Sequence, residues 1–371
     1  MTDPADKNVT PRVLAFHLPQ FHPIKENSEW WGAGFTEWHN VAKARPLFRG
    51  HVQPKLPGEL GFYDLRLKQT RADQAALARQ YGVHGFCYWH YWFDGKRLLE
   101  QPLEEILALQ EPDFPFCLAW ANESWTGIWH GSPRKVLIEQ VYSPGDADRH
   151  YALLRRFFHD PRYIKHDGRP LLYIYKPRDL PAGGTYLQRL RDLAVADGFP
   201  GLFIVGNWTP NPGGQFGSIE SLGLDAAAIT NMSGRHSHSA AHWINSVARK
   251  LFGRLIAFGP QRITYARAMK AMVPVPDVFA FPAYNTVISN WDNTPRSGRR
   301  GFVFLGSSPA LFRTALMRAF SQLSPKSTPG NYVFLKSWNE WAEGNYVEPD
   351  QANGRKYLEA IAEALADFGR I

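Results

Sequence analysis

Short runs of β-branched and aromatic residues alternate along this chain with longer segments of helical period, and this alternation restricts the fold more than any other feature. The pattern is typical of βα units built around a parallel sheet. Strands are predicted at residues 13–17, 84–89, 116–120, 171–175, 202–206, 225–229, 278–282 and 332–336. Helices are predicted at residues 67–81, 98–109, 145–158, 186–197, 240–252, 309–323 and 354–368.

Eight such strands in a chain of 371 residues predict an α/β fold, a (β/α)8 TIM barrel with long βα loops, which needs about 250 residues before insertions. A doubly wound open sheet is the alternative. No G-x-G-x-x-G follows the first strand and no Walker A motif occurs, so the usual nucleotide-binding signatures of that alternative are missing. We therefore interpret residues 1–371 as a single barrel domain.

A basic segment interrupts the predicted barrel late in the chain. Residues 226–276 contain no Asp or Glu but seven Lys and Arg, and apolar residues recur at a spacing of four from Trp243 to Leu255. The pattern predicts a basic helical insertion at residues 230–276. A solvated basic face over ordinary core is the simpler interpretation. The alternative hypothesis is that the insertion binds an anionic membrane surface or a lipid-linked glycan, with no nucleic acid as partner.

The sequence also limits the expected location and cofactors. The N-terminus lacks the apolar core of a signal peptide and no apolar run could span a bilayer, so we expect a cytoplasmic protein, peripheral to the inner membrane if the insertion docks there. Cys87 and Cys117 lie in apolar runs and are expected to be buried thiols. The histidines of HSHSAAH (236–242) have no acid or cysteine nearby, so neither a metal nor another cofactor is expected.

Clusters of polar and aromatic residues follow most of the predicted strands, among them HLPQFH after the first and ANESWTGIWHG after the third. In a barrel these positions converge at the C-terminal ends of the strands, where active sites form. Trp and Tyr combine a flat apolar face with a polar group, which suits sugar rings. The candidate substrate-binding residues are His17, Gln20, Glu37, Trp38, Tyr88, Tyr91, Trp92, Asn122, Glu123, Trp125, Trp129, Asn207, Trp208, Tyr284, Trp291, Asp292, Trp338, Asn339 and Trp341.

The candidate catalytic residues are Glu340 and Glu343, in the stretch SWNEWAEGNYVEPD after the eighth strand. If the strand turns directly into a helix, their Cβ atoms would lie about 5–6 Å apart on one face. Paired carboxylates are the groups that break or make a glycosidic bond. Glutamates three residues apart are common on solvated helices, but two Trp and two Asn beside a buried strand are not the surroundings of a solvated face.

Long motifs resemble a known family. HLPQFHP, WWGAGFTEWHNVAKARPLFRGHVQPKLPGELGFYDL, YGVHGFCYWHYWFDGKRLL, PFCLAWANESWTGIWHG, SNWDNTPR and SWNEWAEGNYVEPD resemble the WbsX-type proteins, classed as glycosyltransferases of surface-polysaccharide loci and related to glycoside hydrolase family 99. The resemblance runs from about Val13 to Leu358. It implies a (β/α)8 barrel and, through family 99, retaining chemistry on an α-linked, mannose-type sugar.

The resemblance also implies roles for the two acids. Glu340 matches the residue that deprotonates the sugar 2-hydroxyl, which then attacks the anomeric carbon and gives a 1,2-anhydro intermediate. Glu343 matches the general acid, which afterwards acts as general base for water. Around the motif the chain departs from family 99, with Ala342 and NYVEP, so the resemblance leaves substrate and reaction direction open.

Three functions are compatible with these residues. A retaining, endo-type hydrolase of a bacterial surface polysaccharide needs only water in the cleft. A glycosyltransferase or transglycosylase of O-antigen or lipopolysaccharide biosynthesis would need a diphosphate or metal site if its donor were a nucleotide sugar, and no such motif is visible. A non-catalytic glycan-binding barrel would not need the paired acids. The sequence therefore favours the hydrolase.

Overall fold

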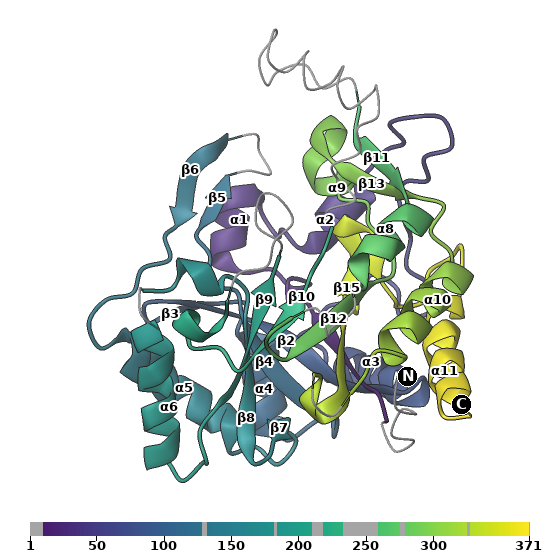
Figure 1. Ribbon diagram of the computed structural model, residues 1–371. Coiled ribbons are helices and arrows are strands. Elements are labelled where there is room, and N and C mark those ends of the chain that lie inside the picture. Colours follow the sequence, from purple (N-terminus) through teal and green to yellow (C-terminus); the bar gives the residue numbers. More distant parts are fainter. Residues whose placement is uncertain are drawn as a thin grey trace, which may run out of the picture.

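The computed structural model describes residues 10–127, 132–181, 184–209, 218–232, 259–274, 279–324 and 327–370. Within these ranges eight parallel strands form a closed barrel (Figure 1). In chain order they are β1 (Arg12–His17), β2 (Val83–Phe93), β4 (Phe116–Trp120), β8 (Arg169–Ile174), β9 (Phe203–Trp208), β10 (Ala226–Ile229), β12 (Ala283–Ile288) and β14 (Tyr332–Lys336). Successive strands pair in parallel, and β1 pairs with both β2 and β14, which closes the sheet. The predicted (β/α)8 barrel is confirmed.

Helices cover the outside of the barrel, with α5 and α6 on one side and α10 and α11 on the other (Figure 1). The described helices are α1 (Lys25–Trp31), α2 (Glu37–Ala42), α3 (Lys68–Gln80), α4 (Gln101–Leu109), α5 (Asp146–Phe158), α6 (Thr185–Ala196), α8 (Tyr265–Met272), α9 (Thr294–Ser297), α10 (Pro309–Phe320) and α11 (Lys356–Phe368). Single 3-10 turns are η2 (Pro177–Asp179), η4 (Glu220–Leu222), η7 (Gly298–Arg300), η8 (Pro329–Asn331) and η9 (Trp341–Glu343). Six of the seven predicted helices are found within a few residues of their predicted ends.

Short strands outside the barrel decorate its C-terminal end. They are β3 (Lys96–Leu98), β5 (Trp125–Gly127), β6 (Ser132–Ile138), β11 (Gln261–Thr264), β13 (Phe302–Leu305), β15 (Asn339–Glu340) and β16 (Asn345–Tyr346), while β7 (Lys165–His166) pairs with the start of β8. β11 and α8 belong to the end of the predicted basic insertion. The rest of that insertion, with the predicted helix 240–252, lies outside the described residues. None of the described helices has the length and apolar character needed to cross a bilayer.

The predicted strand 278–282 is wrong. Residues 279–282 precede the seventh barrel strand, which is β12 (Ala283–Ile288) and pairs with β10 and β14. The sequence is misleading here because Phe279 and Phe281 form an apolar run but stack on each other, half-buried, in a loop. The strand β12 contains two buried polar residues, Asn285 and Thr286, so its sequence is not a continuous apolar run.

Aromatic side chains fill the barrel interior. The Phe16 ring centroid lies 4.7 Å from that of Tyr173 and 5.6 Å from that of Phe334, so rings from β1, β8 and β14 meet inside the barrel. Trp89 stacks on Phe16 at 4.9 Å and contacts Tyr175 at 5.4 Å. The barrel is therefore a packed core rather than a pore, and this plug forms the floor on which a site at the C-terminal end can rest.

Gly85, in β2, tests this packing. An added Cβ would lie 2.7 Å from the Ile164 Cδ1 atom and 2.8 Å from the carbonyl oxygen of Pro115, which is backbone and cannot rotate away. We expect Gly85→Ala to reduce the free energy of unfolding by about 1–3 kcal/mol, measured by urea denaturation. Gly369→Ala is the control, because its Cβ would have no neighbour closer than 3.6 Å. Equal stability of the two variants would contradict the packing described here.

Candidate active site

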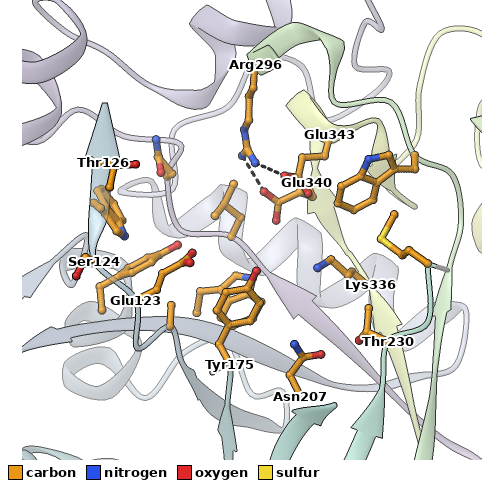
Figure 2. A pocket seen from close by; sticks show the side chains of 18 of the residues that line it. Glu123, Ser124, Thr126, Tyr175, Asn207, Thr230, Arg296, Lys336, Glu340 and Glu343 are labelled. Carbon is orange, nitrogen blue, oxygen red and sulfur yellow. Dashed lines mark hydrogen bonds and ion pairs between the residues drawn. The ribbon is translucent and has the colours of Figure 1, made fainter. Parts of the chain in front are cut away.

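A cavity of about 700 Å³ opens at the C-terminal ends of the barrel strands (Figure 2). The end of each barrel strand, or the loop after it, contributes to the wall: Gln20 after β1, Tyr91 in β2, Glu123 after β4, Tyr175 after β8, Asn207 in β9, Thr230 after β10, Trp291 and Arg296 after β12, and Lys336, Glu340 and Glu343 from β14 onward. The volume is within the range of small-molecule and cofactor sites. Convergence of the strand ends, predicted from the sequence, thus produces one shared hollow.

Glu340 and Glu343 reach this cavity from a tight hairpin rather than from a helix. Glu340 ends β15, the turn η9 (Trp341–Glu343) follows, and β16 returns antiparallel to β15. Gly344 has a φ of 58°, and a Cβ there would lie 2.9 Å from the Cβ atom of Asp292. The backbone N–H of Asp292 donates to the carbonyl oxygen of Glu343 at 2.6 Å. The hairpin is therefore clamped against the loop after β12, and both carboxyl groups point into the cavity.

Arg296, on α9, joins the two acids. Its Nη2 lies 2.7 Å from Glu340 Oε1, its Nη1 2.8 Å from Glu343 Oε1, and its Nε 2.8 Å from Oε1 of the buried Glu37 on α2 (Figure 2 shows the first two contacts). The guanidinium itself is almost fully buried, with 9% of its side chain exposed. Sequence analysis missed Arg296, although it ends the motif SNWDNTPR. The signal that could have identified it is an Arg in a loop after a predicted strand, where the neighbouring loops carry several acidic residues.

The charges of this cluster do not balance. Three carboxyl groups surround one guanidinium, and like charges at this distance oppose joint ionisation. Burial raises the pKa of Glu343 to about 7, against the lowering effect of Arg296 and with a further raising effect of Glu340. Burial also raises the pKa of Glu37 while Arg296 opposes that rise, and the carboxylates hold the pKa of Arg296 well above its usual value. Glu343 is thus able to hold a proton near neutral pH.

The two indoles beside the acid pair do not line the cavity. Trp338 Nε1 donates to Glu348 Oε1 at 2.8 Å and Trp341 Nε1 donates to Glu348 Oε2 at 2.6 Å. The same carboxyl group accepts from the Tyr63 hydroxyl at 2.9 Å and from Gln74 Nε2 at 2.6 Å. Burial raises the pKa of Glu348 to about 7 despite these four donors. Trp338 and Trp341 therefore hold the hairpin in place, and their prediction as sugar-binding residues is not supported.

Eight of the predicted site residues line the cavity: Gln20, Tyr91, Glu123, Trp125, Asn207, Trp291, Glu340 and Glu343. Trp129 lies outside the described residues. The lining also includes residues that the sequence analysis missed: Leu18, Trp31, Trp89, Ala121, Ser124, Thr126, Tyr175, Thr209, Thr230, Met232, Arg296 and Lys336. Tyr175 and Lys336 end predicted strands, so the rule that C-terminal strand ends line a barrel site would have identified them.

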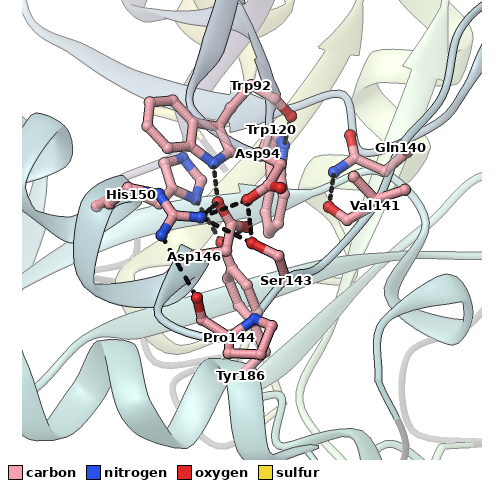
Figure 3. A network of polar contacts seen from close by, with 11 residues as sticks. Trp92, Asp94, Trp120, Gln140, Val141, Ser143, Pro144, Asp146, His150 and Tyr186 are labelled. Carbon is pink, nitrogen blue, oxygen red and sulfur yellow. Dashed lines mark hydrogen bonds and ion pairs between the residues drawn. The ribbon is translucent and has the colours of Figure 1, made fainter.

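Trp92 is engaged elsewhere. Its Nε1 donates to Asp146 Oδ1 at 2.9 Å, and the Tyr186 hydroxyl donates to Asp146 Oδ2 at 2.8 Å (Figure 3). His150 lies against the Trp92 ring, with centroids 4.8 Å apart. This network ties the long strand β2 to the starts of α5 and α6. Trp92 is consequently a structural residue beside the cavity and not part of its wall.

Three other predicted residues point the wrong way because side chains alternate along a strand. Trp89 faces the cavity, so Tyr88 faces the helices and packs against His17. His17 bonds through Nε2 to Gln74 on α3 at 3.1 Å, on the outer side of β1. Trp208 lies next to the inward Asn207 and contacts Arg178 instead. Register within the strand, which periodicity alone does not reveal, decides each case.

Tyr284 and Trp38 lie farther from the cavity. Tyr284 is near the opposite end of the barrel, where its hydroxyl donates to the carbonyl oxygen of Pro329 at 2.7 Å. Trp38 Nε1 donates to the carbonyl oxygen of Tyr63 at 2.8 Å, and its ring packs against Trp341 with centroids 5.5 Å apart. Both are buried packing residues, which corrects their predicted role.

The remaining predicted polar residues brace the loops. Asn122 joins the loops after β4 and β8, since it donates to the carbonyl oxygen of Lys176 and accepts from its N–H, both at 2.8 Å. Asn339 accepts from the N–H of Leu18 at 2.7 Å and so ties the hairpin to the loop after β1. Asp292 accepts from Gln53 at 2.7 Å and contacts His51 Nε2 at 2.8 Å. Among the described residues, no three His, Cys, Asp or Glu side chains lie together as possible metal ligands. The segment HSHSAAH (236–242) lies outside the described residues.

Comparison with known proteins identifies the family. The model for "Glycosyltransferase WbsX" matches residues 13–361. The chain belongs to the WbsX glycosyltransferase family. The WxcX proteins of two strains of Xanthomonas campestris pv. campestris are 38% identical over 359 residues, which is 95% of this chain. The chain spans about half of these relatives, 49% of their length. The resemblance noted in the sequence is confirmed.

Solved structures share the fold of this WbsX-family chain. A glycoside hydrolase-like protein superposes with a TM-score of 0.63 and 15% identity, covering 98% of this chain and 97% of that protein. The GH99 endo-α-mannosidase of Bacteroides thetaiotaomicron superposes with a TM-score of 0.58 and 14% identity, covering 99% of this chain and 98% of the mannosidase. The superpositions show a common barrel architecture, and sequence identities this low support no conclusion beyond the fold.

Glu348 offers a test of how the hairpin is held. Glu348→Gln keeps one oxygen and turns an NH₂ group toward two of the four donors, which leaves buried polar groups unsatisfied. We expect the free energy of unfolding to fall by about 2–3 kcal/mol, measured by urea denaturation. Glu359→Gln on the exposed face of α11 is the matched control and should remain within about 0.5 kcal/mol of the wild type. Wild-type stability of Glu348→Gln would refute the bracing role.

Proposed function

We propose that this chain is a retaining glycosidase that cleaves an α-linked, mannose-like bond in a bacterial surface polysaccharide. The observation that carries the proposal is the placement of Glu340 and Glu343 side by side in the cavity, both in contact with Arg296. Both acids are ion-paired with Arg296, and burial raises the pKa of Glu343 to about 7. Acid–base cleavage of a glycoside needs one carboxyl group that can donate a proton and a second one beside it.

The proposed reaction proceeds in two balanced steps. Glu340 removes the proton of the sugar 2-hydroxyl, O2 attacks the anomeric carbon, and the bond to the leaving oxygen breaks as that oxygen takes the proton of Glu343. Glu343, now a carboxylate, removes a proton from water, which attacks the anomeric carbon and opens the 1,2-anhydro ring. O2 recovers its proton from Glu340. Two inversions at one carbon give net retention, and we propose an endo mode of cleavage.

Membership in the WbsX family favours a second candidate, a glycosyltransferase or transglycosylase. The same two acids would serve if a sugar hydroxyl replaced water in the second step. Incubation with α-mannans and O-antigen polysaccharides distinguishes the two. New reducing ends indicate hydrolysis, and longer products without new reducing ends indicate transfer. Proton NMR of the first-formed product tests retention in either case.

Replacement of either acid should abolish most turnover. We expect Glu340→Gln and Glu343→Gln each to lower kcat at least roughly 100-fold, the usual contribution of acid–base catalysis, while binding of the polysaccharide persists. Turnover is measured by reducing-end release and binding by affinity electrophoresis. Glu359→Gln should retain wild-type kcat. Full turnover in either cavity variant would remove the basis of the proposal.

The dependence of the rate on pH should report Glu343. Because the general acid must be protonated and its pKa is about 7, kcat/KM should fall tenfold per pH unit above about pH 7. The Arg296 cation favours the ionised form, so Arg296→Met should raise the pKa of Glu343 and move this limb to higher pH. Near-UV circular dichroism controls for folding of the variant. A limb that stays in place, in a folded variant, would show that Glu343 is not the titrating acid.

A further inference from the structure

Lys336 lines the cavity and has no counter-ion among the described residues. It is the last residue of β14, it is half-buried, and its ammonium group points into the hollow below the acid pair, on the side of Thr230 (Figure 2). Sequence analysis assigned it no role, and the proposed cleavage does not use it. A barrel strand therefore ends in a cationic group inside the candidate binding site.

The other charges of the cavity wall are already paired. Arg296 contacts three carboxyl groups, and Glu123 lies 2.8 Å from the Nζ atom of Lys176 at the rim. Across the parts of the chain that the structure describes, no carboxylate lies within 4.0 Å of Lys336 Nζ. The charge of Lys336 favours ionisation of Glu343, but through space rather than by contact. A half-buried cation of this kind can form a charge-assisted hydrogen bond with an anion that arrives with the ligand.

The surroundings of Lys336 suit a sugar ring that carries one negative charge. The Nζ atom lies over the ring of Trp291, 5.5 Å from its centroid, in a cation–π contact, and this mostly buried ring also lines the cavity. Asn207 and Thr230 supply neutral polar groups nearby. A phosphate or diphosphate site normally has several cations or a row of backbone N–H groups, whereas one ammonium group matches one carboxylate.

We propose that Lys336 and Trp291 form a subsite for an acidic sugar, with the ammonium group of Lys336 bound to the carboxylate of a uronic acid in the polysaccharide. This inference rests on the proposed function in one respect, that the cavity binds a glycan. It extends that function by naming the class of substrate: an acidic polysaccharide with a uronic acid next to the bond that is cleaved.

The test compares acidic glycans with their neutral counterparts. Uronic-acid-containing bacterial polysaccharides are each paired with a carboxyl-reduced form, in which the carboxylate becomes a primary alcohol and every linkage is unchanged. Binding is measured by affinity electrophoresis in the Glu340→Gln background, which slows turnover, at low and high salt. We expect at least about 10-fold tighter binding of the acidic form at low salt, the value of one charge-assisted hydrogen bond. The preference should weaken at high salt.

Substitutions of Lys336 make the test specific. Lys336→Gln should remove the preference and Lys336→Arg should keep most of it, because the second change retains the charge. Lys356→Gln, at an exposed position at the start of α11, is the matched control, and it should keep the full preference. If Lys336 acted only on Glu343, Lys336→Gln would shift the pH profile and leave the preference for acidic glycans intact, which would overturn the proposal.

Other outcomes also decide the matter. Equal binding of both forms, or binding of neutral forms alone, would overturn the subsite, as would a preference for phosphorylated glycans with indifference to uronic acids. Hydrolysis of a neutral polysaccharide at full rate would refute the subsite and leave the glycosidase proposal standing. Charge-selective binding without any hydrolysis would support the subsite and refute the glycosidase proposal.

Discussion

The guanidinium of Arg296 lies against carboxyl groups from three separate parts of the chain, and the organisation of the site depends on this contact. Glu37 comes from α2, Glu340 from β15 and Glu343 from η9, and each places an oxygen within 2.8 Å of a different nitrogen of Arg296. Without the cation, three buried carboxyl groups would repel one another and lose hydration without compensation. With it, they are held in a fixed geometry at the cavity wall. One positive charge faces three acids, and burial raises the pKa of Glu343 to about 7.

A second buried acid, Glu348, is stabilised by neutral hydrogen-bond donors instead of by a cation. Glu348 has no cation in ion-pair contact among the described residues and is instead surrounded by four hydrogen-bond donors, two of them the indoles of Trp338 and Trp341. The hairpin that carries Glu340 and Glu343 is therefore fixed on one side by a charge cluster that faces the cavity and on the other by a neutral-donor cluster that faces the helices. Rigid support of this kind keeps reacting groups in position before substrate binds.

Local patterns predicted the elements well and the contacts poorly. The strand ends and the clusters that follow them could be read from periodicity and composition, because a parallel barrel places all C-terminal strand ends at one face. Neighbours such as Tyr88 and Trp89 could not be separated in that way. Both are aromatic, but one faces the helices and the other the cavity, since a shift of one residue reverses the face. β12 was misplaced for a related reason: its Asn285 and Thr286 are buried by tertiary packing that the local sequence pattern does not indicate.

The sequence by itself determined the barrel, the face on which a site would form, and the two acids that would occupy it, because these depend on short-range patterning and on residue type. Only the tertiary structure decided the partners. Glu37 and Arg296 are 259 positions apart, and Arg296 is 44 positions from Glu340. Closure of the sheet brings such residues within hydrogen-bond distance, and burial together with electrostatic coupling then raises the pKa of Glu343. Tertiary packing likewise decides that Trp291 lines the cavity while Trp338 donates a hydrogen bond to the buried Glu348.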